Sequence, residues 1–370
     1  MGNLSAKTKP RLVALWPECE NVHLTKDLGM IPFILYKYHD YNSSIACYKM
    51  EEFPYLDNEV KGLGVERIEN TGDILRDGDE YLIKNANNID ILFLMGIYSF
   101  TLSWINVYKT FNPNGKIYLK LDANLYWMNS MDMTKDVLEI LDKCDLISVE
   151  SSRLHHYLNQ KWPLKIELIP NGYYNFNESN DVAFEEKENV ILTVGRIGTF
   201  QKANDVLLKA FKLVNEEIPD WRIKIIGNME ETFMEYLQSY FSENPTLMKK
   251  VELPGSINDR FELEKEYRKA KVFCLTSRWE GFPLVFTEAA RAGCYVISTD
   301  IDPAYDITCC GKLGSLFPID DVEKLAETLL EVCKDSGQIE KVCCEIQEVS
   351  KRNFDWVTIG NKIDRLLHLN

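Results

Sequence analysis

Basic charge and long apolar runs are both scarce in this chain of 370 residues. The formal net charge is −15, and residues 1–172 and 173–370 each carry more acidic than basic side chains. Nucleic-acid-binding proteins show the opposite, a strong basic excess, so we expect no nucleic-acid partner. The longest apolar stretch, Ile89–Phe100, contains Asp90 and is too short to span a bilayer. The composition therefore favours a globular protein.

Metal-ligand spacings are also missing. The ten Cys form no Cys-x-x-Cys pair, and no zinc spacing or secretory leader is visible. Several Cys stand in apolar strand-like runs, where Cys behaves as a small hydrophobic residue. No Asp-x-Asp pair stands in a loop typical of a metal site. We therefore expect a reduced, cytoplasmic protein without a metal or a resident cofactor.

The chain is longer than a single hydrophobic core usually grows, so two domains are expected. Strand-like and helix-like patterns alternate in its first half, which predicts an α/β protein with a doubly wound, mainly parallel sheet. We predict an N-terminal Rossmann-like domain, a polar linker, a second Rossmann-like domain and a final helix, at residues 1–172, 173–189, 190–352 and 353–370. The predicted strands of the first half are Leu12–Trp16, Ser44–Tyr48, Ile89–Met95, Ile117–Leu121, Leu146–Val149 and Ile166–Ile169.

The most informative segment is Ser277–Gly293, SRWEGFPLVFTEAARAG. It follows a strand-like run, and Gly281 permits a tight turn before a helix. We place Pro283 in the first helical turn, where a missing N–H costs nothing, and the helix ends at the last glycine of the segment. Glu280 then lies in the loop, and Glu288 lies on the second helical turn.

This arrangement brackets a site for an anion. The N–H groups of Gly281, Phe282 and Leu284 lie at a helix N-terminus, where phosphate is readily bound. A carboxylate on either side suits a ligand with phosphate in its middle and hydroxyl groups at both ends. A nucleotide-sugar has that shape.

A second phosphate-binding segment runs from Val190 to Asp205, VILTVGRIGTFQKAND. A β-branched strand ends at a glycine, and a helix follows, with Asn204 or Asp205 as its N-cap. Arg196 therefore projects from the carboxyl end of a strand, where open α/β sheets bind ligands, and Lys202 follows in the same loop. Both side chains bind phosphate oxygens well.

Together these segments resemble the retaining glycosyltransferases of family 4, which have the GT-B fold of two Rossmann-like domains facing across a cleft. The resemblance covers most of the C-terminal half, and the stretches that carry it include Trp221–Gly227, Val251–Asp259, Ala270–Gly293 and Asn353–Ile363. It implies catalytic roles for Arg196 and Lys202 at the donor diphosphate and for Glu280 at the transferred sugar. It also implies that Glu288 holds ribose hydroxyls.

The same resemblance implies several finer contacts. The Phe282 and Leu284 amides would meet sugar and phosphate, with Gly281 and Pro283 shaping the turn, and Ile257 would lie near the base. The final helix would pack back onto the first domain.

The N-terminal half resembles the family more loosely. Gly29 is expected near the donor phosphates, although an ordinary glycine at the start of a helix explains it equally well. Many relatives place a histidine beside the donor sugar, after a strand that corresponds here to IYLKLDANLYW. None of the five histidines fills that position. Asp122 stands there instead and becomes a candidate acceptor or sugar contact, with a turn or cap residue as the plainer interpretation.

The resemblance implies a retaining, metal-independent transfer of a hexose-type sugar from a nucleoside-diphosphate sugar to a hydroxyl acceptor. A lipid-linked glycan is the acceptor that the family suggests, with peripheral contact at the inner face of a membrane. A phosphorylase on the same fold and a catalytically silent nucleotide-binding protein remain alternatives. A retaining hydrolase fits poorly, because its carboxylates would lie ~5–5.5 Å apart across one bond. A dehydrogenase also fits poorly, because Gly62 and Gly64 are followed by Arg67 where a third glycine is needed.

Overall fold

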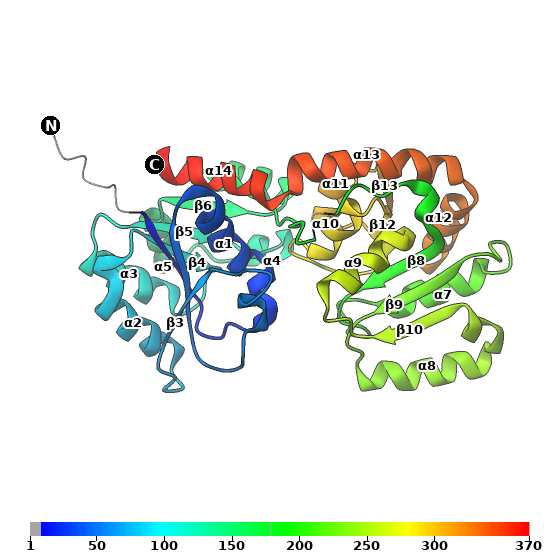
Figure 1. Cartoon of the computed structure of the whole chain (residues 1–370), viewed down its shortest axis with the longest axis horizontal. Coiled ribbons are helices and arrows are strands. Elements are labelled where there is room, and N and C mark those ends of the chain that lie inside the picture. The colour runs from blue at the N-terminus through cyan, green and yellow to red at the C-terminus, as the bar shows by residue number, and fades with distance from the viewer. Residues whose placement is uncertain (1–8, 178, 370) are drawn as a thin grey trace. The chain divides into compact units, whose positions relative to one another are not determined.

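The computed structural model describes residues 9–177 and 179–369, which form two compact units (Figure 1). Unit 1 contains the chain up to Tyr174 together with Trp356 onward, and unit 2 is Asn175–Asp355. Each unit is a parallel β-sheet with connecting helices. The predicted α/β class, two Rossmann-like doubly wound domains as in the GT-B fold, is confirmed.

Unit 1 has a described sheet of seven parallel strands in the order β3-β2-β1-β4-β5-β6-β7. Four of the five residues of β1 are buried, as expected for strands covered by helices on both faces. The strands are β1 Arg11–Leu15, β2 Asn42–Cys47, β3 Gly64–Arg67, β4 Ile91–Met95, β5 Lys116–Lys120, β6 Leu146–Val149 and β7 Glu167–Leu168.

The connecting helices of unit 1 include several with a polar side chain at the N-cap, such as Ser151 before α6. The α-helices are α1 Asp27–His39, α2 Ile74–Asn85, α3 Thr101–Phe111, α4 Leu125–Ser130, α5 Lys135–Lys143, α6 Ser152–Lys161 and α14 Trp356–Leu369. Three 3₁₀ turns join them, η1 Asn21–Thr25, η2 Pro54–Leu56 and η3 Ala86–Asn88.

The last helix, α14, packs on α1 in unit 1. A Cβ atom at Gly360 would lie 2.3 Å from Ile34 Cγ2, so a glycine is needed for this approach. Lys362 Nζ donates to Leu168 O at 2.7 Å, and Lys116 Nζ donates to Leu367 O at 2.5 Å. The helix therefore belongs to the unit that the N-terminal half of the chain builds.

Unit 2 has a described sheet of six parallel strands in the order β10-β9-β8-β11-β12-β13. The order reverses between β8 and β11, which pair directly. The strands are β8 Glu188–Val194, β9 Arg222–Ile226, β10 Val251–Gly255, β11 Ala270–Leu275, β12 Tyr295–Thr299 and β13 Gly314–Phe317. The helices are α7 Asn204–Val214, α8 Glu231–Glu243, α9 Arg260–Lys269, α10 Leu284–Arg291, α11 Asp302–Ile307, α12 Val322–Lys334 and α13 Ser336–Phe354, with 3₁₀ turns η4 Phe184–Glu186 and η5 Pro245–Lys249.

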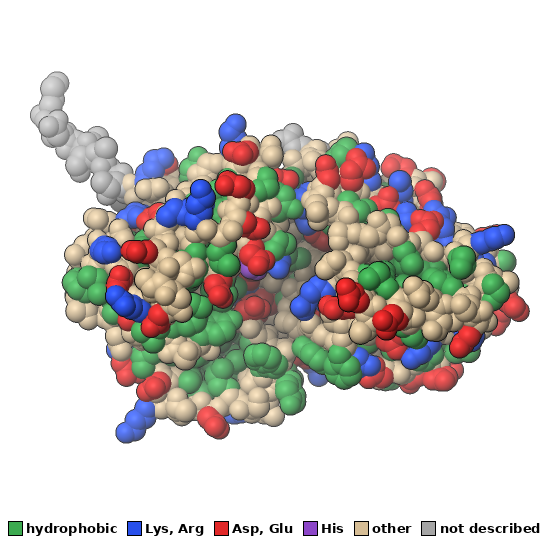
Figure 2. Space-filling view, turned by 90° about the horizontal axis from the view of Figure 1, so that it is seen from below, with side chains coloured by type: hydrophobic (Ala, Val, Ile, Leu, Met, Phe, Trp, Pro, Cys, Tyr) green, Lys and Arg blue, Asp and Glu red, His purple; other side chains and the backbone are tan. Residues whose placement is uncertain are grey.

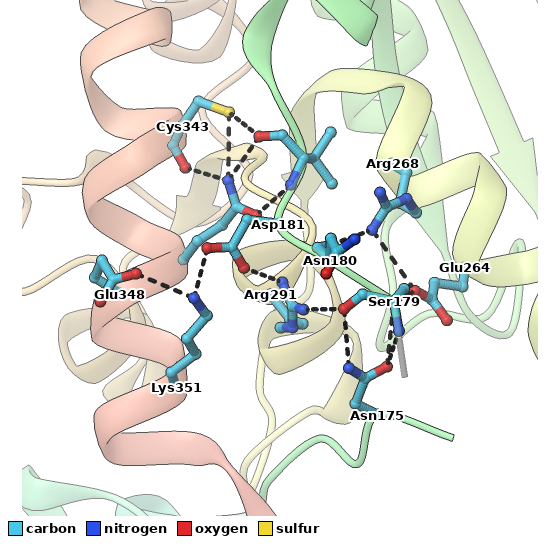
Figure 3. A network of polar contacts seen from close by, with 12 residues as sticks. Asn175, Ser179, Asn180, Asp181, Glu264, Arg268, Arg291, Cys343, Glu348 and Lys351 are labelled. Carbon is cyan, nitrogen blue, oxygen red and sulfur yellow. Dashed lines mark hydrogen bonds and ion pairs between the residues drawn. The ribbon is translucent and has the colours of Figure 1, made fainter. Parts of the chain in front are cut away.

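Much of the segment expected as a linker, residues 173–189, is held by polar contacts within unit 2 (Figure 3). Asp181 forms ion pairs with Arg291 of α10 at 3.0 Å and with Lys351 of α13 at 2.5 Å. Arg268 of α9 donates to Asn180 O at 2.7 Å. These contacts connect the segment to three helices.

The strand β3 and the helix α2 are among the elements of unit 1 that the sequence pattern does not predict. β3 lies at the sheet edge with no fully buried residue, so it lacks an apolar run. α2 buries only four residues, and two of them, Asp77 and Gly78, are not apolar. Gly62 precedes the edge strand β3, and Gly64 is its first residue.

The surface carries mixed charge. Asp and Glu side chains are interspersed with Lys and Arg on the face that Figure 2 draws. Exposed pairs such as Lys209–Asp205 at 2.7 Å contribute little stability individually. Among the helices formed by residues 9–177 and 179–369, none has both the length and the apolar character that crossing a membrane requires.

Two glycines meet at the carboxyl ends of β8 and β9. Gly227 has φ +146°, and a Cβ atom there would lie 1.7 Å from Gly195 O. Substitution Gly227→Ala should therefore force the backbone apart and destabilise unit 2 by at least about 3 kcal/mol. Thermal unfolding should show a Tm lower by on the order of 6–12 °C.

The matched control is Gly337→Ala in α13, where the nearest atom to a new Cβ lies at 3.6 Å. That variant should keep or slightly raise the Tm, because alanine favours a helix. Equal Tm values for both variants would show that the Gly195–Gly227 contact does not constrain the fold.

Candidate functional site

The main candidate site lies at the point of unit 2 where the strand order reverses. Arg196 follows β8 after Gly195, and Glu280 lies in the loop after β11. These two strands are neighbours in the sheet and run parallel, so their carboxyl ends open at the same edge. Such switch points are where open α/β sheets bind ligands.

A network of side-chain contacts connects the two loops. Lys202 Nζ lies 2.5 Å from Glu280 Oε1, and the two side chains are only 13% and 9% exposed. Gln201 Nε2 donates to Trp279 O at 2.8 Å and to Glu280 Oε2 at 3.4 Å. Arg196 Nη2 donates to Gln201 Oε1 at 2.8 Å. The structure thus brings together the three predicted catalytic residues, and it adds Gln201.

The exposure of these groups differs in a useful way. A buried lysine and a buried glutamate largely neutralise each other, and removing one partner would leave an uncompensated charge. The Arg196 side chain is exposed, and Gln201 takes one of the five N–H donors of a guanidinium. Arg196 is therefore positioned by a neutral amide and keeps its positive charge available to an anion.

The turn into α10 differs from the sequence prediction at one residue. Pro283 is the N-cap, with extended backbone at φ −70° and ψ 127°, and the helix begins at Leu284. The proline ring fixes φ at a value that suits both an N-cap residue and the first residue of a helix. The sequence alone therefore does not separate these two positions. The first N–H groups of α10 have no carbonyl partner within the helix.

Neighbouring residues of this turn lie as the sequence suggested. The chain bends at Gly281, and the buried Phe282 ring packs on the Phe354 ring with 5.7 Å between centroids. Gly293 takes the left-handed conformation, φ +72°, just after the helix. The predicted helix over this segment is therefore confirmed, with a shifted start.

The loop after β8 contains a second correction. The residue before α7 is Ala203, with φ +45°, whereas we expected Asn204 or Asp205 as the cap. Asn204 Oδ1 accepts a hydrogen bond from Gly198 N at 2.8 Å instead. Its side chain therefore closes the loop that carries Arg196 and does not cap the helix.

Glu288 lies on α10 and contacts α9. Tyr267 donates through its hydroxyl to Glu288 Oε2 at 2.9 Å, and Arg260 forms an ion pair with Glu288 Oε1. Ile257 lies in the short loop between β10 and α9, three residues before Arg260. Sequence reasoning missed Arg260 and Tyr267, although their seven-residue spacing on one helix places them on the same face.

Gly29 lies in the first turn of α1, in unit 1. A Cβ atom there would lie 2.2 Å from Leu24 O, so the glycine is required by the chain's own packing. This contact accounts for the residue without a ligand, and a role at the donor phosphates stays a prediction.

Asp122 follows β5 and belongs to a charged group at the carboxyl ends of the unit 1 strands. Lys120 is fully buried, and its Nζ lies 3.1 Å from Glu150 Oε1, 3.7 Å from Asp27 Oδ2 and 3.2 Å from Ile169 O. Although solvent reaches Asp122, the protein around it and the nearby Asp27 carboxylate raise its pKa. Local sequence patterns do not indicate these buried partners.

Titration in this group follows from burial. Burial lowers the pKa of Lys120, but the Glu150 and Asp27 carboxylates outweigh it and raise that pKa above its ordinary value. Burial raises the pKa of Glu150 to about 8, and Asp122 and Asp27 add to the rise while Lys120 opposes it. Glu150 therefore loses its proton at a higher pH than an ordinary glutamate, and Lys120 stays charged.

This shift makes stability depend on pH. In the unfolded chain a glutamate has a pKa of about 4.3. Between that pH and about 8, Glu150 therefore binds more protons in the folded chain than in the unfolded chain. The contribution of Glu150 is most favourable below this window and falls as pH rises through it. The difference in free energy of unfolding between wild type and Glu150→Gln should change by up to about 1.4 kcal/mol per pH unit.

Urea unfolding from pH 5.5 to 8.5 measures this difference. The control is Glu52→Gln at an exposed residue, which should leave the pH dependence of wild type unchanged. If Glu150→Gln and wild type show parallel pH dependence, the buried carboxyl does not titrate as described.

Metal-ligating side chains do not gather in the described part of the chain: no group of three or more His, Cys, Asp or Glu residues there could hold an ion.

Comparison with known proteins shows a family resemblance within the C-terminal half of the chain. Residues 175–348 match the family model of glycosyl transferases group 1. The phosphatidyl-myo-inositol mannosyltransferase of Mycobacterium leprae is 28% identical over 177 residues, which are 48% of this chain and 45% of that protein. The aligned stretch thus spans less than half the length of this curated relative. The resemblance to group 1 glycosyltransferases is confirmed for this region, and assignment to family 4 stays a prediction.

Solved structures extend the likeness to the whole fold. Sucrose-phosphate synthase from Thermosynechococcus elongatus superimposes with a TM-score of 0.73 at 15% identity, covering 98% of this chain and 99% of that chain. Anabaena HepE in complex with UDP and glucose gives a TM-score of 0.73 at 15% identity, covering 98% and 100%. At this identity the likeness concerns the fold.

Proposed function

We propose that the protein is a retaining glycosyltransferase of family 4 that moves a hexose-type sugar from a nucleoside-diphosphate sugar to a hydroxyl acceptor. One observation carries the proposal: Arg196, Lys202 and Glu280 form one contact network at the switch point of unit 2. The match of residues 175–348 to group 1 glycosyl transferases supports it.

The donor diphosphate would bind beside Arg196 and the N-terminus of α10. Cleavage of the anomeric C–O bond leaves negative charge on the departing phosphate, and preorganised donors and cations stabilise that charge. Arg196 supplies a guanidinium that Gln201 already orients. Lys202 supplies an ammonium group that is already paired with Glu280. Neither group must be rearranged by a large movement before the charge develops.

Glu280 would orient the transferred sugar. Its carboxylate is held on Oε1 by Lys202 and on Oε2 by Gln201, so its position is fixed before a sugar binds. The acceptor hydroxyl would attack the face from which the phosphate departs, and that phosphate would take the hydroxyl proton. The new C–O bond then keeps the anomeric configuration of the donor.

The identities of donor and acceptor rest on the relatives. The HepE structure contains UDP and glucose, which makes UDP-glucose the first donor to test. The Mycobacterium leprae relative is named a phosphatidyl-myo-inositol mannosyltransferase. This name supports a lipid-linked acceptor for the present chain, reached at the inner face of a membrane. In this chain, unit 1 and Asp122 would contribute to acceptor or sugar binding.

Substitution Arg196→Ala should lower kcat by about 100-fold or more, because its contact strengthens as the leaving phosphate gains charge. The KM for the donor should change much less. Steady-state kinetics with a panel of nucleotide-sugars, selected by thermal shift, measures both constants and whether the product is a glycoside or a sugar phosphate.

The matched control is Arg222→Ala, an arginine at the first residue of β9, whose ion pairs are with Glu188 and Glu252. It should retain kcat. An unchanged kcat for Arg196→Ala would remove this arginine from the mechanism, and release of sugar phosphate in the presence of free phosphate would indicate a phosphorylase.

Turnover should survive treatment with EDTA, because Arg196, Lys202 and the N-terminus of α10 supply the positive charge that a divalent ion supplies elsewhere. The measurement is the rate of nucleoside diphosphate release before and after exhaustive chelation. Loss of activity that added Mg²⁺ or Mn²⁺ restores would contradict a metal-independent mechanism.

A further inference from the structure

Both carboxylate oxygens of Glu288 are held by one helix. Arg260 is the first residue of α9, and Tyr267 lies two turns later on the same face. Arg260 forms its ion pair with Oε1, and the Tyr267 hydroxyl donates to Oε2 at 2.9 Å. The Glu288 side chain is 14% exposed, so the carboxylate is largely enclosed and still reachable.

The contacts leave a defined number of acceptor positions. A carboxylate oxygen can accept two hydrogen bonds. Among the described residues, Arg260 contacts one Glu288 oxygen and Tyr267 the other, which leaves one acceptor position on each oxygen. Two acceptor positions about the width of a carboxylate apart match a vicinal diol, in which neighbouring hydroxyls point the same way.

Tyr267 is suited to act as a donor only. Its side chain is buried at 2% exposure, and burial together with the Glu288 carboxylate raises its pKa well above the ordinary value. The phenol therefore keeps its proton. Arg260 is always charged at physiological pH, so both partners orient Glu288 as an acceptor.

We propose that Arg260 and Tyr267 are positioning residues that orient Glu288 to accept both hydroxyls of a ribose. The inference rests on the proposed function, because it assumes that Glu288 faces the nucleotide. It extends that function by making the diol, and so the discrimination of ribose from 2′-deoxyribose, depend on two residues of α9.

The opposite effect is also defined. If the Arg260–Glu288 pair competes with the ribose, its removal should strengthen nucleotide binding. If it positions the carboxylate, removal should weaken binding, and the loss should concern the ribonucleotide more than its 2′-deoxy counterpart. The sign of the change therefore decides between the two.

The test is calorimetric titration of the full chain with UDP, GDP, CDP and ADP, followed by the 2′-deoxy form of the tightest binder. Wild type should prefer the ribonucleotide by about tenfold, the effect of one lost hydrogen bond. Arg260→Met and Tyr267→Phe should bind the ribonucleotide more weakly and reduce the preference to about twofold. Glu288→Gln combined with either variant should cause little further loss.

The control is Arg268→Met on the same helix, because Arg268 donates to Asn180 O and lies 3.9 Å from Glu264. It should keep the wild-type preference. Wild type that binds none of the four nucleotides would overturn the proposed function itself. Wild type that binds and discriminates, with Arg260→Met and Tyr267→Phe behaving as Arg268→Met does, would overturn only the positioning role.

Discussion

The buried ion pair between Lys202 and Glu280 is the interaction on which the candidate site depends. It joins loops that follow β8 and β11, two strands that neighbour each other in the sheet and lie far apart in the sequence. Because both groups are largely withdrawn from water, separating them would leave an uncompensated charge. The pair therefore fixes one loop against the other, and Gln201 extends this order to the exposed Arg196.

The packing beneath these loops serves the same end. Gly227 allows β9 to approach Gly195, the residue before Arg196, and Asn204 closes the loop by accepting from Gly198. The Phe282 ring packs on Phe354, at the end of α13. The loops of the candidate site therefore rest on close contacts that tolerate little change in side-chain size. Such support holds the side chains of a loop in a defined geometry.

The sequence predicted the fold well because apolar runs and glycines mark buried strands and their ends. It also predicted that Arg196, Lys202 and Glu280 would lie in loops that follow strands. It could not predict Gln201, Arg260 or Tyr267, because their roles arise from contacts between segments that local patterns do not relate. Local sequence was ambiguous in three other places, because it fits more than one backbone state there. These are the Pro283 cap, the Ala203 cap and the edge strand β3. In unit 1 the buried Lys120 reads as an ordinary strand residue until Glu150 and Asp27 are placed beside it.

We infer that a nucleoside-diphosphate sugar is held at the switch point of unit 2 by these loops. Hydrogen–deuterium exchange of the full chain with and without UDP-glucose tests it most directly, because backbone amides at the N-terminus of α10 and in the β8 loop would be covered. We expect slower exchange at residues 195–203 and 280–288, with unit 2 residues remote from the sheet edge unchanged. Protection that spares both segments while appearing elsewhere, under conditions where the donor is shown to bind, would contradict it.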